Sequence, residues 1–212
     1  MRVGVVDYGM GNLASVAKAV EKVGAGSFVS DDAAELGAAD VIVLPGVGHF
    51  KAGMESLERL GLAGFLRDWG GAGRPLVGIC LGMQLLFTHS EEGDVKGLGI
   101  VPGKVVLLEP GVKCPQIGWN AVSAEGTSSD VLAPFEGRYF YFNHSYVCRP
   151  DEDVAAGRTD YGGEFVSSIH AGNVIGFQFH PEKSSSDGLA LLGRALETLA
   201  AARPAPAGPA SR

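Results

Sequence analysis

The sequence predicts an α/β fold in which an open, mostly parallel sheet is flanked by helices and is joined in the second half by antiparallel strands. Nearly continuous apolar runs at residues 3–6, 41–44 and 76–79 are typical of strands buried on both faces of a parallel sheet. Stretches with helical apolar spacing lie between these runs. From residue 98 onward, short strand-like stretches separated by turn residues replace the helical pattern.

Each element is placed by its own local pattern. Apolar or β-branched runs predict the strands, helical spacing that ends near glycines predicts the helices, and Ala171-Gly172-Asn173 predicts a hairpin turn. The expected strands are 3–6, 27–30, 41–44, 76–79, 100–108, 119–123, 139–148, 164–170 and 174–179, and the expected helices are 13–23, 54–69, one that starts within 83–87, and about 187–202.

Length and composition favour one globular domain over residues 1–202, followed by a Pro/Ala-rich tail at 203–212 that we expect to be disordered. A net charge of −7 disfavours a nucleic-acid or anionic membrane surface. No apolar run approaches the roughly 18–20 residues that span a bilayer. Asp7 comes too early for a signal peptide, so we expect a cytoplasmic location.

The chain has 3 cysteines, which are widely spaced and form no CxxC or Cys/His cluster. The pattern predicts no metal site, and nothing else in the sequence calls for a cofactor. An odd number of cysteines in an intracellular chain indicates free thiols. Cys114 and Cys148 are expected to be small buried hydrophobic residues, whereas Cys80 lies in a different setting.

A glycine pattern near the start resembles a dinucleotide-binding fingerprint. Residues 9–14 match GxGxxA after the first strand, and Asp31 lies at about the spacing of a ribose-binding acid. However, Asp7 precedes the glycines, and its carboxylate opposes an incoming phosphate. We therefore expect this loop to face a ligand or a partner rather than a dinucleotide.

Cys80 lies between a buried-strand pattern and the start of a helix, with Gly78 and Gly82 on either side. A sharp strand-to-helix turn needs such small neighbours, and it directs helix N-terminal amides at the sulfur. Helix amides and a nearby imidazolium favour the nucleophilic thiolate form of a cysteine. The Leu81 amide would then face a developing oxyanion. The alternative is a buried structural cysteine.

A second motif, His180-Pro181-Glu182, follows the last predicted strand. Residues two apart on an extended backbone point to the same side, so Glu182 is predicted to reach the imidazole of His180. A carboxylate on one ring nitrogen fixes the tautomer and leaves the other nitrogen to accept a thiol proton. Alone, the motif could be a surface turn. Together with Cys80, at the end of another strand of the same sheet, it predicts nucleophilic catalysis.

The other histidines have weaker claims to that role. His89 is predicted near the end of the helix after Cys80, and His170 is predicted to be solvated. His49 and His144 lie in predicted loops as binding or packing residues rather than bases.

Together these residues resemble the class I (triad) glutamine amidotransferases, whose pattern is a Gly-x-Cys-x-Gly-x-Gln elbow with a downstream His-Pro-Glu. Within that class the chain is similar to the glutaminase subunits of imidazole glycerol phosphate synthases. The resemblance extends from residue 7 to 184, and one departure is Gln116-Ile117, where His-Met is expected. Its further segments are DYGMGN at 7–12, LPGVGHF at 44–50, IGWN at 117–120, YFNHSY at 141–146 and GFQFHPEKS at 176–184.

The resemblance implies a flavodoxin-like sheet and a thioester mechanism that hydrolyses glutamine to glutamate and ammonia, with no cofactor. It assigns the nucleophile to Cys80, the acid and base to His180 and the orienting carboxylate to Glu182. Residues that it implies for the oxyanion and the glutamine substrate are Val47, Gly48, Leu81, Gln84, Ser145 and Tyr146.

The resemblance also implies a partner, the cyclase (synthase) subunit, which would receive the ammonia through a channel in a heterodimer. Its interface is predicted at Asn12, Trp119, Asn120 and Tyr141, although these side chains could instead pack locally. Two alternatives are a glutaminase that serves another synthase, such as those of the anthranilate or vitamin B6 pathways, and a catalytically silent binding module.

Overall fold

The computed structural model describes residues 1–126 and 129–202. The predicted α/β fold with a mostly parallel central sheet and added antiparallel strands is confirmed. Neighbouring strands of the parallel part run in the order β2-β1-β3-β4-β13. These strands are β1 (Arg2–Val6), β2 (Gly26–Ser30), β3 (Val41–Leu44), β4 (Leu76–Ile79) and β13 (Val174–Phe177).

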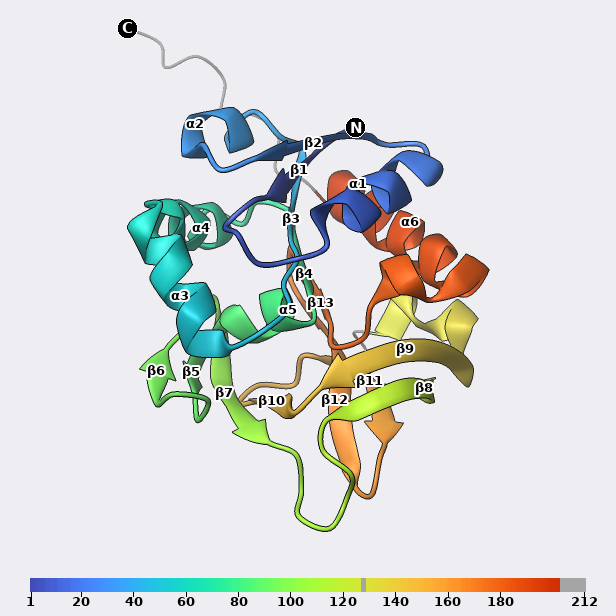
Figure 1. The fold of residues 1–212 in the computed structure, drawn as a ribbon. Coiled ribbons are helices and arrows are strands. Elements are labelled where there is room, and N and C mark those ends of the chain that lie inside the picture. Colours follow the sequence, from blue (N-terminus) through green and yellow to red (C-terminus); the bar gives the residue numbers. More distant parts are fainter. Residues whose placement is uncertain (127–128, 203–212) are drawn as a thin grey trace, which may run out of the picture.

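Helices cover both faces of this parallel part (Figure 1). On one face lie α1 (Leu13–Lys22) and α6 (Ser185–Ala201), and on the other lie α3 (Phe50–Arg59), α4 (Leu62–Gly71) and α5 (Leu81–Leu85). A short helix, α2 (Ala33–Leu36), follows β2. Two apolar cores result, one on each side of the sheet, because the strand residues alternate between the faces.

The sheet continues from β13 into an antiparallel region. Its order is β12-β10-β7-β5-β6, with β5 and β7 parallel to each other. A hairpin of β8 and β9 lies beside it and is joined to it through β11. The bounds are β5 (Phe87–Ser90), β6 (Val95–Lys96), β7 (Val101–Leu107), β8 (Gln116–Ala124), β9 (Arg138–His144), β10 (Tyr146–Pro150), β11 (Ala155–Asp160) and β12 (Glu164–Ala171), with 3₁₀ turns at Ser129–Val131, Ala133–Phe135 and Pro181–Lys183.

Some predicted boundaries were wrong. The helix predicted over 54–69 is divided into α3 and α4, because Gly61 takes a left-handed conformation with φ 71° that no helix interior accommodates. The strand predicted over 139–148 is divided at Ser145 into β9 and β10. Strands β6 and β11 were not predicted, because their sequences lack an apolar run.

The helix predicted after Cys80 is only five residues long, and the chain enters β5 directly afterwards. His89 therefore lies on a strand, where its Nε2 pairs with Asp94 at 2.9 Å. Cys148 is buried as predicted, but the prediction for Cys114 was wrong, because that side chain is exposed. The tail at 203–212 lies outside the described residues. Among the helices of residues 1–126 and 129–202, none has the length and apolar character needed to cross a membrane.

Candidate active site

Cys80 occupies the turn between β4 and α5, and its backbone is strained. It has φ 54° and ψ −111°, a combination that costs a non-glycine residue on the order of 1–3 kcal/mol. Both flanking glycines are required by contact: a Cβ on Gly78 would lie 2.7 Å from the Met83 Cα, and a Cβ on Gly82 would overlap the Leu44 carbonyl oxygen. Such stored strain is typical of a residue held for its chemistry.

His180 reaches this elbow from the neighbouring strand β13. The Cys80 amide donates to the Phe177 carbonyl at 2.7 Å, which places the two strand ends side by side. The His180 amide donates to the Tyr141 carbonyl at 2.9 Å, and the Ser184 hydroxyl donates to the His180 carbonyl at 2.6 Å. These bonds to β9 and to the next turn fix the position of the imidazole.

Glu182 holds the Nδ1 side of the His180 ring. Nδ1 lies 2.9 Å from the carboxylate Oε1, and both side chains are only 2% exposed. The contact is the predicted one, but the reason given for it was wrong. Residues 181–183 form a 3₁₀ turn rather than an extended segment, and this turn brings the carboxylate back beneath the ring.

The electrostatics favour a protonated His180. Burial by itself lowers its pKa, but Cys80 and the Glu182 carboxylate outweigh burial and raise the pKa to about 9. Because Nδ1–H donates to Glu182, Nε2 is the nitrogen available for chemistry. Among the described residues Nε2 has no hydrogen-bond partner. Cys80 is nevertheless one of the two side chains that raise the pKa of the ring. The arrangement can therefore hold and deliver a proton beside a thiol.

A cavity of about 250 Å³ opens next to the Cys80 sulfur. The six residues predicted for the oxyanion and the substrate all line it: Val47, Gly48, Leu81, Gln84, Ser145 and Tyr146. A further cavity of about 300 Å³ lies among β7, β10, β11 and β12, and its lining includes none of the predicted site residues. We assign the chemistry to the first of these two cavities because it contains the nucleophile.

Gln84 belongs to a buried amide network that also reaches the thiol. Its Nε2 donates to the Tyr146 carbonyl at 2.8 Å and to Gln178 Oε1 at 3.1 Å. The Gln178 amide in turn lies 3.9 Å from Cys80 Sγ. The network orients the Gln84 amide at the cavity wall. Sequence reasoning missed Gln178, although its place two residues before His180 could have signalled it.

Sequence reasoning also missed Glu92 and Asn143, which line the same cavity. The Glu92 carboxylate accepts from the Phe50 amide at the start of α3 at 2.6 Å. The Asn143 carbonyl is 3.8 Å from Cys80 Sγ. No motif marks Glu92, because it comes from the turn between β5 and β6, which only the fold brings to the cavity.

His144 is buried at the cavity, and it is not placed as a base. Burial lowers its pKa to about 4, so the ring is neutral at pH 7. Nδ1 lies 2.9 Å from the Tyr146 carbonyl, which can only accept, so Nδ1 carries the proton. His49 instead caps α3 by accepting from the Lys51 amide at 3.2 Å. His170 is partly buried.

In the glycine loop after β1, a carboxylate already occupies the first glycine amide. Asp7 Oδ1 already accepts from the Gly9 amide at 3.0 Å, so a carboxylate occupies the position of an incoming anion. Asn12 is exposed, and its side chain accepts from the Ser15 amide at 3.3 Å as the cap of α1. This geometry supports the expectation that the loop binds no dinucleotide.

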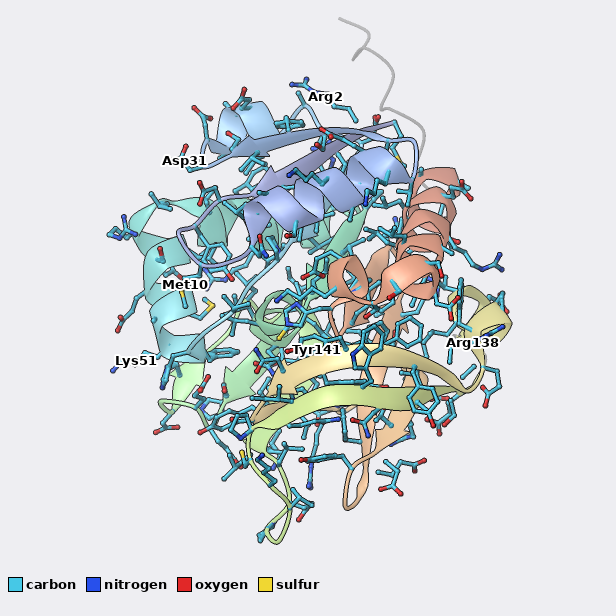
Figure 2. The ribbon with its side chains drawn as sticks, turned by 45° about the vertical axis from the view of Figure 1, so that its right-hand side comes forward. Arg2, Met10, Asp31, Lys51, Arg138 and Tyr141 are labelled. Carbon is cyan, nitrogen blue, oxygen red and sulfur yellow. The ribbon has the colours of Figure 1, made fainter. Side chains whose placement is uncertain are left out.

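The predicted interface residues do not all share one face. Trp119 is 48% exposed and packs edge-on against Tyr141, with ring centroids 6.1 Å apart. Figure 2 shows Tyr141 on β9, with Arg138 at the start of the same strand. Asn120 alternates with Trp119 along β8, and its Oδ1 accepts from buried Gln116. Trp119, which is exposed, and Tyr141, which is half-buried, therefore form an aromatic pair, and the Asn120 side chain points to the other face of the strand pair.

The geometry thus combines an α/β sheet, a cysteine on a glycine-flanked elbow, and a histidine–carboxylate pair at the adjoining strand end. The family model of class I glutamine amidotransferases matches residues 4–195. The chain belongs to the class I glutamine amidotransferase family.

Within the family, the chain is similar to proteins named imidazole glycerol phosphate synthase subunit HisH. The protein of that name from Aquifex aeolicus is 52% identical over 91% of this chain and 94% of its own length. The one from Methanopyrus kandleri is 48% identical over 92% of this chain and 98% of its own. The one from Moorella thermoacetica is 47% identical, over 90% and 91% respectively.

Solved structures support the fold. A crystal structure of a glutamine amidotransferase superposes with a TM-score of 0.75 at 19% identity, covering 94% of this chain and 98% of that one. The structure of PurLQS from Thermotoga maritima gives a TM-score of 0.73 at 22% identity, over 93% and 98%.

Proposed function

We propose that this chain is the glutaminase subunit of imidazole glycerol phosphate synthase, with a class I amidotransferase domain at residues 1–202. The observation that carries the proposal is the match to subunits of that name at 52% identity across 91% of the chain. It is joined by the placement of Cys80 in the wall of one cavity, with the His180–Glu182 pair at the end of the adjoining strand. The reaction is hydrolysis of glutamine to glutamate and ammonia, and it needs no cofactor.

In the first step the Cys80 thiolate attacks the side-chain amide carbon of glutamine and forms a tetrahedral oxyanion. His180 then donates its Nε2 proton to the departing nitrogen, the carbon–nitrogen bond breaks, and ammonia leaves a γ-glutamyl thioester. The pKa of about 9 supports this acid role, because the imidazole holds its proton at neutral pH. Neutral His180 next takes a proton from water, which attacks the thioester and releases glutamate.

Glu182 keeps His180 in the correct orientation and stabilises its charged form. The Leu81 amide and an amide of the Gly46-Val47-Gly48 segment supply the oxyanion donors. Within the part of the chain that the structure describes, neither the Leu81 amide nor the amides of this segment donate a hydrogen bond, so they are available to an oxyanion. Losing one such donor costs about 3–4 kcal/mol of barrier, so the orientation of this segment controls the rate.

The cavity volume of about 250 Å³ and its lining fit a glutamine molecule. Gln84, Ser145 and Tyr146 bind it through amide, hydroxyl and backbone contacts. Glu92 adds a carboxylate on the same wall, which suits the α-ammonium group of an amino acid.

The ammonia passes through a channel to the cyclase subunit in a cytoplasmic heterodimer, where it is used to form imidazole glycerol phosphate and AICAR in histidine biosynthesis. Trp119 and Tyr141 form the centre of the interface, with Asn12 and Asn120 as further contacts. The Tyr141 backbone carbonyl also binds the His180 amide at 2.9 Å, so this strand joins the proposed interface to the acid.

Two experiments test the proposal. A glutamine-mimicking electrophile should label Cys80 in the presence of the cyclase subunit, and no adduct would indicate a silent binding module. Cys80→Ala should abolish use of glutamine, while the complex still makes product from added ammonia. If the chain binds only the synthase of another pathway, the assignment of the partner is wrong.

A further inference from the structure

Tyr8, in the loop that follows β1, is a buried phenol that the proposed chemistry does not use. Its side chain is completely buried, and its hydroxyl donates to the Pro45 carbonyl at 2.8 Å. Its own carbonyl accepts a hydrogen bond from the Ser56 hydroxyl on α3, and Arg59 Nη2 donates to that hydroxyl at 2.8 Å. Both the hydroxyl and the backbone carbonyl of Tyr8 are thus held by hydrogen bonds. The hydroxyl is bonded to Pro45, the residue that precedes the Gly46-Val47-Gly48 segment.

The segment after Pro45 packs directly against the nucleophile elbow. A Cβ on Gly46 would lie 2.9 Å from the Leu81 Cβ, and it would also overlap the Tyr8 hydroxyl oxygen. On its other side, a Cβ on Gly48 would lie 2.9 Å from Met10 Cε. Figure 2 shows Met10 on the α3 side of the molecule. The segment is therefore enclosed between the elbow and the loop that follows β1.

The Pro45 carbonyl and the Gly46 amide belong to one planar peptide unit. A hydrogen bond that fixes the carbonyl direction also fixes the amide direction of that plane. Gly46 and Gly48 flank Val47, and Gly48 has φ 107°, so the backbone on both sides of Val47 lacks the Cβ atoms that restrict rotation elsewhere, and such bonds help to fix the peptide planes. Within the described chain, these amides have no acceptor of their own.

We propose that Tyr8 is a positioning residue: its hydroxyl, through the Pro45 carbonyl, holds the Gly46-Val47-Gly48 segment in the orientation that presents an amide to the oxyanion. This role rests on the proposed function. Tyr8 touches neither the substrate nor the sulfur in this role, and acts only through the peptide plane that it holds.

The protonation state of Tyr8 supports a permanent donor role. Burial, and to a smaller extent Cys80, raise the pKa of the phenol. It therefore stays protonated across the range in which the enzyme can be assayed, and the hydrogen bond to Pro45 persists at every assay pH. Removing the hydroxyl should lower the rate without altering the shape of the pH profile.

The test is Tyr8→Phe, which deletes only the hydroxyl, assayed alone and with the cyclase subunit. We expect kcat for glutamine to fall by about 5- to 100-fold, the range for a buried acceptor left unpaired. KM should change less than 3-fold, because the substrate contacts of Gln84 and Tyr146 are untouched. Alkylation of Cys80 by iodoacetamide, which forms no oxyanion, should stay within about 2-fold of wild type.

Tyr161→Phe is the matched control, because the Tyr161 hydroxyl also donates to a backbone carbonyl, that of Lys113, at 2.8 Å, and neither residue lines the cavity. Its kcat should equal that of wild type. Ser56→Ala is a second variant, which removes the anchor of the Tyr8 carbonyl and keeps the phenol. It should lower kcat by about 2- to 10-fold.

The outcomes separate the two ideas. If wild type turns over glutamine and both Tyr8→Phe and Ser56→Ala match it in kcat, the role of Tyr8 is overturned and the proposed function stands. If KM rises more than 3-fold and iodoacetamide reactivity falls together with kcat, Tyr8 acts on the general structure of the site and the positioning role is also overturned. If wild type neither turns over glutamine nor is labelled at Cys80 with the cyclase subunit present, the proposed function fails and the role of Tyr8 fails with it.

Discussion

Replacing Glu182 by glutamine should change both the stability and its dependence on pH. The two side chains of the pair are 2% exposed, and Nδ1 of His180 lies 2.9 Å from the carboxylate. Glutamine can keep this hydrogen bond through its carbonyl oxygen, but it removes the negative charge. Its NH₂ group then takes the place of Oε2, which has no partner among the described residues. An unpaired buried donor costs about 1–3 kcal/mol at any pH.

The loss of the negative charge of Glu182 adds a contribution to the free energy of unfolding that depends on pH. In the folded protein the pKa of His180 is about 9, against an ordinary value of 6.5. Below pH 6.5 both states are protonated, and the stabilisation of the imidazolium, about 3 kcal/mol, is fully present. Between pH 6.5 and 9 only the folded state keeps the proton, so stability falls as pH rises. Above about pH 9 the contribution is lost.

Cys80 and Glu182 both raise this pKa, so the substitution should remove only part of the stabilisation. We expect Glu182→Gln to lower the free energy of unfolding by about 1–2 kcal/mol more at pH 6 than at pH 9.5. Urea unfolding of wild type and variant at pH 6, 7.5 and 9.5 measures the difference. The kcat for glutamine should also fall about 100-fold or more, because the carboxylate orients and stabilises the imidazolium.

The control is Glu58→Gln on the surface. Glu58 pairs with Arg67 at 2.8 Å, but these side chains are 54% and 41% exposed, so the pair contributes about 0–1 kcal/mol. Glu58→Gln should therefore lower the free energy of unfolding only slightly, and by the same amount at every pH. An equal loss of stability at pH 6 and pH 9.5 in Glu182→Gln would refute the argument, because it would mean that the carboxylate does not hold the proton on His180.

Three further predictions concern packing, acid stability and binding. Gly82→Ala should destabilise the fold by several kcal/mol, because the new Cβ would overlap the Leu44 carbonyl oxygen. The control is Gly64→Ala in α4, where the Cβ meets open space, and it should be neutral or stabilising by up to about 1 kcal/mol. Thermal unfolding compares the two variants, and equal effects would contradict the overlap. His144 has a pKa of about 4 because it is buried, so the free energy of unfolding should fall by up to about 3 kcal/mol as pH drops from 6.5 to 4. His144→Asn retains a donor for the Tyr146 carbonyl and should reduce this dependence on pH. An unchanged slope in acid unfolding curves would exclude His144 as its source. Trp119→Ala should change the free energy of unfolding by less than about 1 kcal/mol, because the side chain is exposed. It should weaken binding to the cyclase subunit by about 30-fold in calorimetric titration, because aromatic residues often dominate interfaces. Unchanged affinity would place the interface elsewhere.

Local pattern was sufficient for the parallel half of the fold. The apolar runs at 3–6, 41–44 and 76–79 could be buried on both faces only in a sheet covered by helices, and the structure has them as β1, β3 and β4. Pattern was insufficient where tertiary pairing decides. The residues after Leu85 look helical, yet they form β5 because β7 offers a parallel partner.

The sequence by itself determined the types of residue at the candidate site. Glycines around Cys80 and the His180–Glu182 spacing indicated a nucleophile and a histidine–carboxylate pair, because few other structures need those residues at those positions. Only the tertiary structure decided the rest: a 3₁₀ turn, not an extended strand, brings Glu182 to the imidazole. It also places Glu92 in the cavity and Tyr8 against the Pro45 carbonyl. The contacts of Tyr8 with Pro45 and of Glu92 with Phe50 join residues tens of positions apart. No local pattern encodes them, because they depend on how β1, β3 and the later loops meet at one edge of the sheet.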